Sequence, residues 1–239
     1  MKHTTHGIFS FILLFVLLLL PGIASSSAKD DPLLSMVILE KLEYQTSGDQ
    51  EPLVINTQGW IGKDLSKLWL KSELERSGGH LEEFELQALY SRAIAPFWDL
   101  QIGVRQDFKP SPQRSWLALG VQGLAPYFID LEATLFFGQG RQLALRIDAE
   151  HDIPISQKLI LTPEIEVNLY SQDDQALGIG AGLSDYQAGL RLRYEIVREF
   201  APYIGIQWNK EFGETANFSS STGERTGETF FVIGLHAWF

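Results

Sequence analysis

The sequence has 239 residues, with 19 Lys or Arg against 30 Asp or Glu, a net charge of −11 at pH 7, and no cysteine. This acidic balance excludes nucleic acid as a partner, because binding to phosphate backbones depends on clustered Lys and Arg. Without cysteine, no disulfide framework can form.

The chain begins with a pattern typical of a secretory signal peptide. Lys2 precedes an apolar run over residues 8–20, and small residues follow up to Ala28. The run is shorter than the roughly 20 residues that a membrane-spanning helix needs. We therefore expect a signal peptide over residues 1–28, a short periplasmic segment over 29–35, and one domain over 36–239.

Beyond the signal peptide, short segments alternate between apolar and polar residues. In residues 164–170, for example, Ile165, Val167 and Leu169 share one face of a strand, and the polar residues between them share the other. One face suits lipid and the other suits water. There is no further continuous apolar stretch near 18 residues, so helical crossing of a membrane is excluded. The pattern predicts an all-β fold, a closed antiparallel transmembrane β-barrel.

Twelve such segments can be counted, an even number with lengths close to the 9–11 residues of a tilted spanning strand. They cover residues 36–46, 53–62, 67–77, 81–92, 98–108, 114–123, 128–137, 141–152, 158–170, 186–197, 203–212 and 229–239. The last one ends on Phe239, as the closing strands of outer-membrane barrels do. With both barrel termini in the periplasm, the two longest connections, 171–185 and 213–228, lie outside the cell.

Aromatic residues recur near the segment ends. An Ala-Pro-aromatic tripeptide occupies residues 95–97, 125–127 and 201–203, at three of the short turns. Proline cannot donate to a sheet ladder, so it belongs at a turn, and the aromatic ring after it suits the membrane interface. We expect the same interfacial position for Trp60, Trp98, Trp116 and Trp208.

The inward faces of the segments carry full charges. Residues two apart on a strand share a face, so paired acidic residues point into the same lumen. We predict that the lumen is lined by Glu73, Glu75, Glu83, Glu85, Arg146, Asp148, Glu150, Glu164, Glu166, Arg191, Arg193 and Glu195. These charges either balance one another in ion pairs or form a route or site for cations.

Several strings resemble those of a known family. They are WIGKD at residues 60–64, LWLKSE at 68–73, QALYSRAIAPFWD at 87–99, GVQGLAPY at 120–127 and GLRLRYEI at 189–196. With them, residues 39–239 resemble the copper resistance protein B family. The resemblance implies an outer-membrane barrel of a Gram-negative bacterium that binds or passes copper ions, with a periplasmic multicopper oxidase as a partner. Typical members carry an extension rich in Met and His before the barrel, but residues 25–34 contain neither.

The candidate copper ligands are therefore few. They are His236, which faces inward on the last segment, His80 in an outside loop, and Met36, with the lumen carboxylates as further oxygen donors. No Ser or Thr lies two residues from His80, His151 or His236, so no nucleophile–base pair shares a strand face, and we expect no enzyme activity. A generic narrow outer-membrane pore without a metal role is the alternative.

Overall fold

The computed structural model describes residues 31–47 and 51–239; the predicted signal peptide at 1–28 lies outside them. In this part of the chain, no helix has the length and apolar character needed to cross a membrane.

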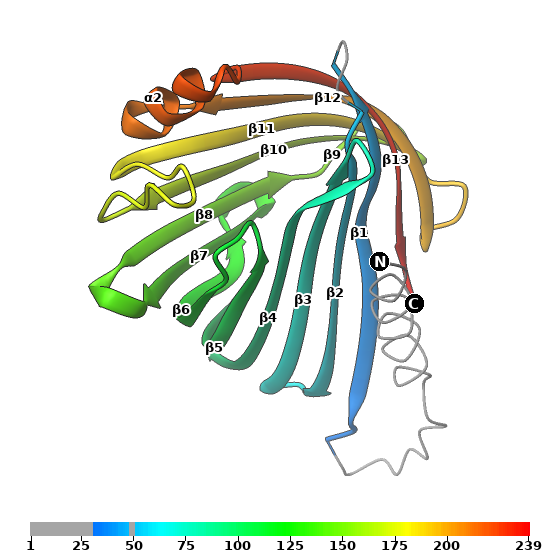
Figure 1. Cartoon of the computed structure of the whole chain (residues 1–239). Coiled ribbons are helices and arrows are strands. Elements are labelled where there is room, and N and C mark those ends of the chain that lie inside the picture. Colours follow the sequence, from blue (N-terminus) through cyan, green and yellow to red (C-terminus); the bar gives the residue numbers. More distant parts are fainter. Residues whose placement is uncertain (1–30, 48–50) are drawn as a thin grey trace, which may run out of the picture.

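One antiparallel sheet closes on itself to form a barrel (Figure 1). Apart from the two-residue strand β9, each strand pairs with its neighbours in sequence, so that β8 pairs with β10, and β1 pairs with β13 to close the circle. The strands are β1 (Leu34–Thr46), β2 (Leu53–Lys63), β3 (Ser66–Ser77), β4 (His80–Ala95), β5 (Trp98–Lys109), β6 (Arg114–Ala125), β7 (Ile129–Gly138), β8 (Leu143–His151), β9 (Ile153–Pro154), β10 (Leu159–Tyr170), β11 (Gly182–Tyr194), β12 (Phe200–Glu211) and β13 (Gly227–Trp238).

The twelve predicted segments are confirmed as the twelve long strands. The additional strand, β9, has only two residues and pairs with β10 alone, inside a predicted turn. Strand β11 begins at Gly182, four residues earlier than predicted, and β1 begins at Leu34, two residues earlier. The closed 12-strand barrel therefore follows the alternation of the sequence closely.

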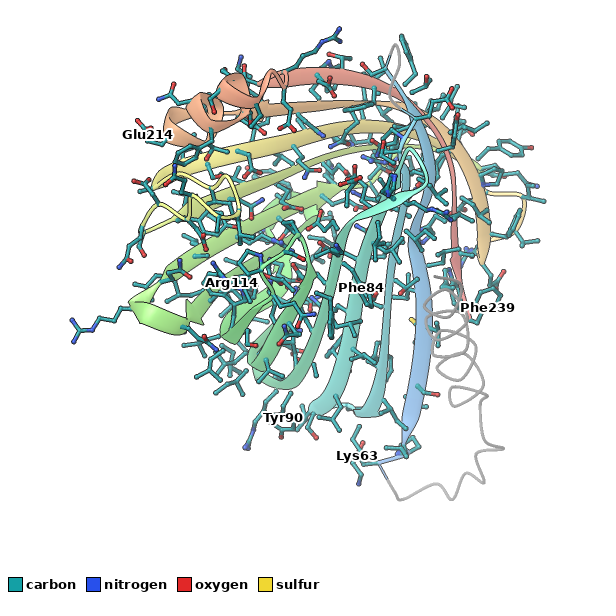
Figure 2. All side chains as sticks on the ribbon, in the orientation of Figure 1. Lys63, Phe84, Tyr90, Arg114, Glu214 and Phe239 are labelled. Carbon is teal, nitrogen blue, oxygen red and sulfur yellow. The ribbon has the colours of Figure 1, made fainter. Side chains whose placement is uncertain are left out.

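The two ends of the barrel differ in their connections. At the turn end, short turns join β2 to β3, β4 to β5, β6 to β7, β8 to β10 and β11 to β12. Phe239 also lies at this end. At the loop end lie the two long connections, one of which contains a helix, α2 (Gly213–Thr222), that was predicted only as a loop. Figure 2 shows Lys63 and Phe239 at the turn end and Glu214 of α2 at the loop end.

The two long connections fold against each other over the mouth of the barrel. The backbone N–H of Gly180 donates to Thr215 Oγ1 of α2 at 2.8 Å, and Thr215 Oγ1 also lies 2.9 Å from the hydroxyl of Ser184. On the other side, Arg114 of β6 binds Asp174 through Nε and Nη2, at 3.0 and 2.7 Å. The connection before β11 is thereby attached at both of its edges.

The outward face of the sheet is apolar and exposed, as a lipid-facing surface must be. Leu117, Ile204 and Phe231 are 60–66% exposed there. The inward face holds most of the polar residues and one small apolar cluster, formed by Leu89, Trp116, Ala118, Phe136 and Ala144. Burial thus reverses the usual order of a globular protein, with charges inside and apolar side chains outside.

Of the four tryptophans expected at the membrane interface, Trp98 and Trp208 lie on the outward face, but Trp60 and Trp116 lie on the inward face. Trp116 is buried in the lumen, where its indole N–H donates to Asp107 Oδ2 at 2.8 Å, and Trp60 lies opposite Trp69. At Trp116, the buried carboxylate of Asp107 accepts the indole N–H, which lets this ring lie inward.

Candidate functional site: the charged lumen

The lumen contains two cavities arranged along the barrel. The larger, about 720 Å³, lies at the loop end, where α2 and residues 175–179 complete its lining. The smaller, about 250 Å³, lies toward the turn end and includes His236 in its lining. Both are lined mostly by charged and amide side chains, so they suit water and ions.

A first ion-pair network joins β1 to β10, β11 and β12. Glu43 is fully buried, and its carboxylate accepts bonds from Arg191 Nε at 2.5 Å, Tyr203 Oη at 2.9 Å and Gln45 Nε2 at 2.9 Å. Arg191 also pairs with Glu164. The buried charge of Glu43 is therefore compensated by one cation and two neutral donors.

Two glycines make room for this network. A Cβ atom at Gly234 would lie 2.5 Å from Cζ of Tyr203, and one at Gly189 would lie 2.0 Å from Nη1 of Arg191. Because no side chain stands at these positions, the ring of Tyr203 and the guanidinium of Arg191 can lie against the wall of the barrel.

A second network joins β8 and β5 to β3 and β4. Arg146 contacts Glu85 at 3.1 Å and Glu73 at 3.3 Å, and Arg105 contacts Glu85 at 2.7 Å. Arg105 also pairs with Asp107 at 2.7 Å. Both guanidinium groups lie over the ring of Phe136, whose face attracts cations, with their central carbons 4.8 and 5.9 Å from the ring centre.

Ion pairs cross the lumen as chords, and three of them join strands equally far apart. Lys41 of β1 pairs with Glu164 of β10, Arg146 of β8 with Glu85 of β4, and Lys71 of β3 with Glu132 of β7. In the circular strand order, each pair joins strands that are four positions apart. The lumen is therefore crossed by charged side chains rather than being an open tube.

The predicted lumen charges point inward with one exception. Eleven of the twelve line a cavity or take part in the networks: Glu73, Glu75, Glu83, Glu85, Arg146, Asp148, Glu150, Glu164, Glu166, Arg191 and Arg193. Glu195 lies one residue beyond the end of β11 and lines neither cavity, because the strand ends earlier than its alternation suggests.

Further charged residues line the lumen that the sequence did not predict, among them Glu40, Lys41, Glu43, Arg105, Asp107 and Glu132. Glu132 lies between two apolar residues, and Arg105 and Asp107 lie two apart between Val104 and Phe108, so the same strand period would have found them. Glu40, Lys41 and Glu43 lie in β1, where the alternation is interrupted between Leu39 and Lys41.

Four carboxylates face one another across β3 and β4. Glu73 lies directly opposite Glu85, and Glu75 lies opposite Glu83. Among residues 31–47 and 51–239, Glu73, Glu83 and Glu85 form the one group of three His, Cys, Asp or Glu residues whose ligand atoms lie within 4.8 Å of one another. Arg146 and Arg105 bind two of these carboxylates, so part of the negative charge is already compensated.

The three predicted copper ligands are not brought together. His80 is exposed at the loop end, as the first residue of β4. His236 lies near the turn end and lines the smaller cavity, while Met36 lies opposite Trp60 and lines neither cavity. His236 Nδ1 donates to the carbonyl oxygen of Glu40 at 3.3 Å, which leaves the lone pair of Nε2 free to accept a proton or a metal ion.

Solved structures with a similar fold are outer-membrane porins. The NanC porin aligns with 85% of this chain and 99% of its own, at a TM-score of 0.57 and 11% identity. The KdgM porin aligns with 86% of this chain and 99% of its own, at a TM-score of 0.51 and 13% identity. At such low identity, the similarity concerns the barrel fold alone.

Sequence comparison identifies the family. The family model described as "Copper resistance protein B precursor (CopB)" matches residues 33–239. Copper resistance protein B of Escherichia coli is 47% identical over 204 residues, which are 85% of this chain and 69% of that relative. A copper resistance protein B homolog of Pseudomonas syringae pv. tomato is 43% identical over 210 residues, 88% of this chain and 71% of that relative. The chain therefore belongs to the copper resistance protein B family, as an outer-membrane β-barrel of a Gram-negative bacterium.

Proposed function

We propose that this barrel takes up copper as Cu(II) into its lumen and binds it there or passes it on, without catalysing a reaction. The supporting observation is the excess of negative charge around both cavities. Nine Asp or Glu and five Lys or Arg line the larger cavity, and eight Asp or Glu and five Lys or Arg line the smaller one. A cavity with this charge balance concentrates cations and repels anions.

The ligand chemistry supports Cu(II) rather than Cu(I). The cavities offer carboxylate oxygens and the imidazole of His236, which suit Cu(II). Cu(I) prefers thiolate and thioether sulfur, but the sequence has no cysteine and two methionines. We therefore propose a small capacity, about one or two Cu(II) ions held by few ligands.

Within this proposal, His236 is the strongest candidate ligand. It lines the smaller cavity beside several carboxylates, including Glu40 and Glu150, and its hydrogen bond to the Glu40 carbonyl fixes the ring through Nδ1. Metal-binding histidines are typically oriented through the second nitrogen in this way. His80 and Met36 would contribute only separate, weaker sites, since they lie outside both cavities.

Calorimetric titration of the purified barrel with Cu(II) tests the proposal. We expect binding of about one or two ions, weakened in His236→Ala. His80→Ala is the matched control, because it removes an exposed imidazole at the opposite end of the barrel. Many tightly held Cu(I) ions would contradict the proposed ligand chemistry. Absence of Cu(II) binding, together with conductance that does not distinguish cations from anions, would favour the generic pore.

We also propose a periplasmic multicopper oxidase as the partner, on the basis of the family resemblance. The short turns of bacterial barrels face the periplasm, so the turn end would be the docking side. Co-purification of the barrel with such an oxidase from the source bacterium tests this. Recovery of the barrel without any copper oxidase, under conditions that preserve the membrane, would contradict it.

A further inference from the structure

The two cavities share a boundary that any ion passing through the lumen would have to cross. Seven residues line both cavities and define this junction: Lys41, Asn56, Glu73, Arg146, Glu166, Gln187 and Arg191. Three of them are cations. Two others, Glu73 and Glu166, are carboxylates, so the junction keeps a net positive charge, which opposes a metal ion moving between the cavities because like charges repel.

Lys41 reaches the junction because β1 contains a β-bulge. The register of β1 shifts between Leu39 and Lys41 against β2, and between Leu39 and Leu42 against β13. Two successive residues therefore face the lumen: Glu40 lines the smaller cavity and Lys41 lines both. Bulges re-aim side chains in this way and are frequent next to functional sites.

The other two cations of the junction are fixed by several partners. Arg146 is held by Glu73, Glu85 and Asn168, and Arg191 by Glu43, Glu164 and Gln207. Both guanidinium side chains are less than a tenth exposed. Moving Arg191 would leave the buried carboxylate of Glu43 without its cation, and moving Arg146 would leave Glu73 without its cation.

Lys41 is held differently. Within the described ranges, its ammonium has one carboxylate partner, Glu164 at 2.5 Å, and its side chain is 25% exposed. If this contact breaks, Glu164 keeps its ion pair with Arg191. The lysine side chain also has four rotatable methylene bonds, so its charge can move aside without moving the backbone.

We propose that Lys41 is the gating residue between the two cavities, a tethered cation that occupies Glu164 until an entering metal cation displaces it. The inference rests on the proposed passage of copper and names the residue that controls it. Displacement exchanges one cation on Glu164 for another, so this carboxylate stays compensated, and the released ammonium, already 25% exposed, turns to water in the cavity. A divalent ion interacts more strongly with the carboxylate than a monovalent ammonium does, which would favour divalent cations at this point.

The test measures ion conductance of the full barrel in planar lipid bilayers, with KCl first and CuCl₂ second. Lys41→Met should raise K⁺ conductance severalfold, because the barrier at the junction loses its movable charge. Lys71→Met is the matched control. Lys71 also carries a charge that pairs across the lumen, with Glu132, but it lines only the smaller cavity. Lys41→Arg, which keeps the charge, should conduct no more than the parent barrel.

Equal K⁺ conductance in Lys41→Met and Lys71→Met would overturn the gating role, since any loss of positive charge would then act alike. If Lys41→Met does not yield a folded, heat-modifiable barrel, Lys41→Gln replaces it and the same comparison applies. The copper proposal fails separately. A parent barrel that excludes Cu(II), beside a Lys41→Met variant with raised K⁺ conductance, would refute copper passage and retain the gate.

Discussion

Replacement of Arg191 by alanine should destabilise the folded barrel strongly. Arg191 is 4% exposed and supplies the one cation bound to Glu43, which is itself fully buried. After the change, Glu43 keeps only the neutral donors Tyr203 and Gln45, whereas Glu164 keeps Lys41. The cost is therefore that of one uncompensated buried carboxylate, about 3–5 kcal/mol.

The same strand provides the control. Arg193 lies two residues further on and also pairs with two carboxylates, but those of Glu150 and Asp152 are 42 and 48% exposed. Their charges remain hydrated when the arginine is removed, so Arg193→Ala should cost less than about 1 kcal/mol.

Urea titration of both variants in lipid vesicles, followed by the gel shift between folded and unfolded barrel, measures the difference. Adding Glu43→Gln to Arg191→Ala should restore much of the lost stability, because the buried charge is then absent. If Arg191→Ala unfolds at the same urea concentration as Arg193→Ala, the lumen is hydrated enough to tolerate a lone carboxylate, and the reasoning from burial is wrong.

Deletion of Phe239 should lower the yield of folded barrel in the outer membrane, since its backbone exchanges two hydrogen bonds with Val37 at the closing seam, at 2.8 and 3.0 Å; an unchanged yield on heat-modifiability gels would refute this. Gly234→Ala should lower the urea midpoint, because its Cβ would lie 2.5 Å from the ring of Tyr203; an unchanged midpoint would show that the ring moves aside freely. Asp174→Ala should release one edge of the long loop before β11, because its ion pair with Arg114 is lost, and protease added to intact cells should then cleave this loop faster; equal cleavage of the variant and the parent would mean that the ion pair does not hold the loop.

The strands could be predicted from the sequence because each one separates two solvents. A residue in this barrel faces lipid or the lumen, and the period of two leaves little ambiguity. Helix α2 could not be predicted in this way. Its sequence, GETANFSSST, is rich in Ser and Thr, which are modest helix formers, and it is stabilised by tertiary contacts such as that of Thr215 with Gly180.

The lumen was only partly predictable. Alternation identifies which charges face inward, but not which of them meet, because pairing across the barrel depends on the stagger of strands far apart in sequence. Lys41 and Glu164, for example, are 123 residues apart. The bulge that directs Lys41 inward did leave a signal, since the apolar positions Val37, Leu39, Leu42 and Tyr44 skip one step at Glu40 and Lys41.

The chords across the lumen have a mechanical consequence. The backbone ladder of a closed sheet fixes the perimeter of the barrel, but a ring of fixed perimeter can flatten into an ellipse without losing a ladder bond. The ion pairs Lys41–Glu164, Arg146–Glu85 and Lys71–Glu132 each tie strands a third of the circumference apart. Because opposite charges attract, each pair resists the separation of its two strands, and together they oppose flattening of the cross-section under the lateral pressure of the bilayer. The charges that line the lumen therefore also restrain its width.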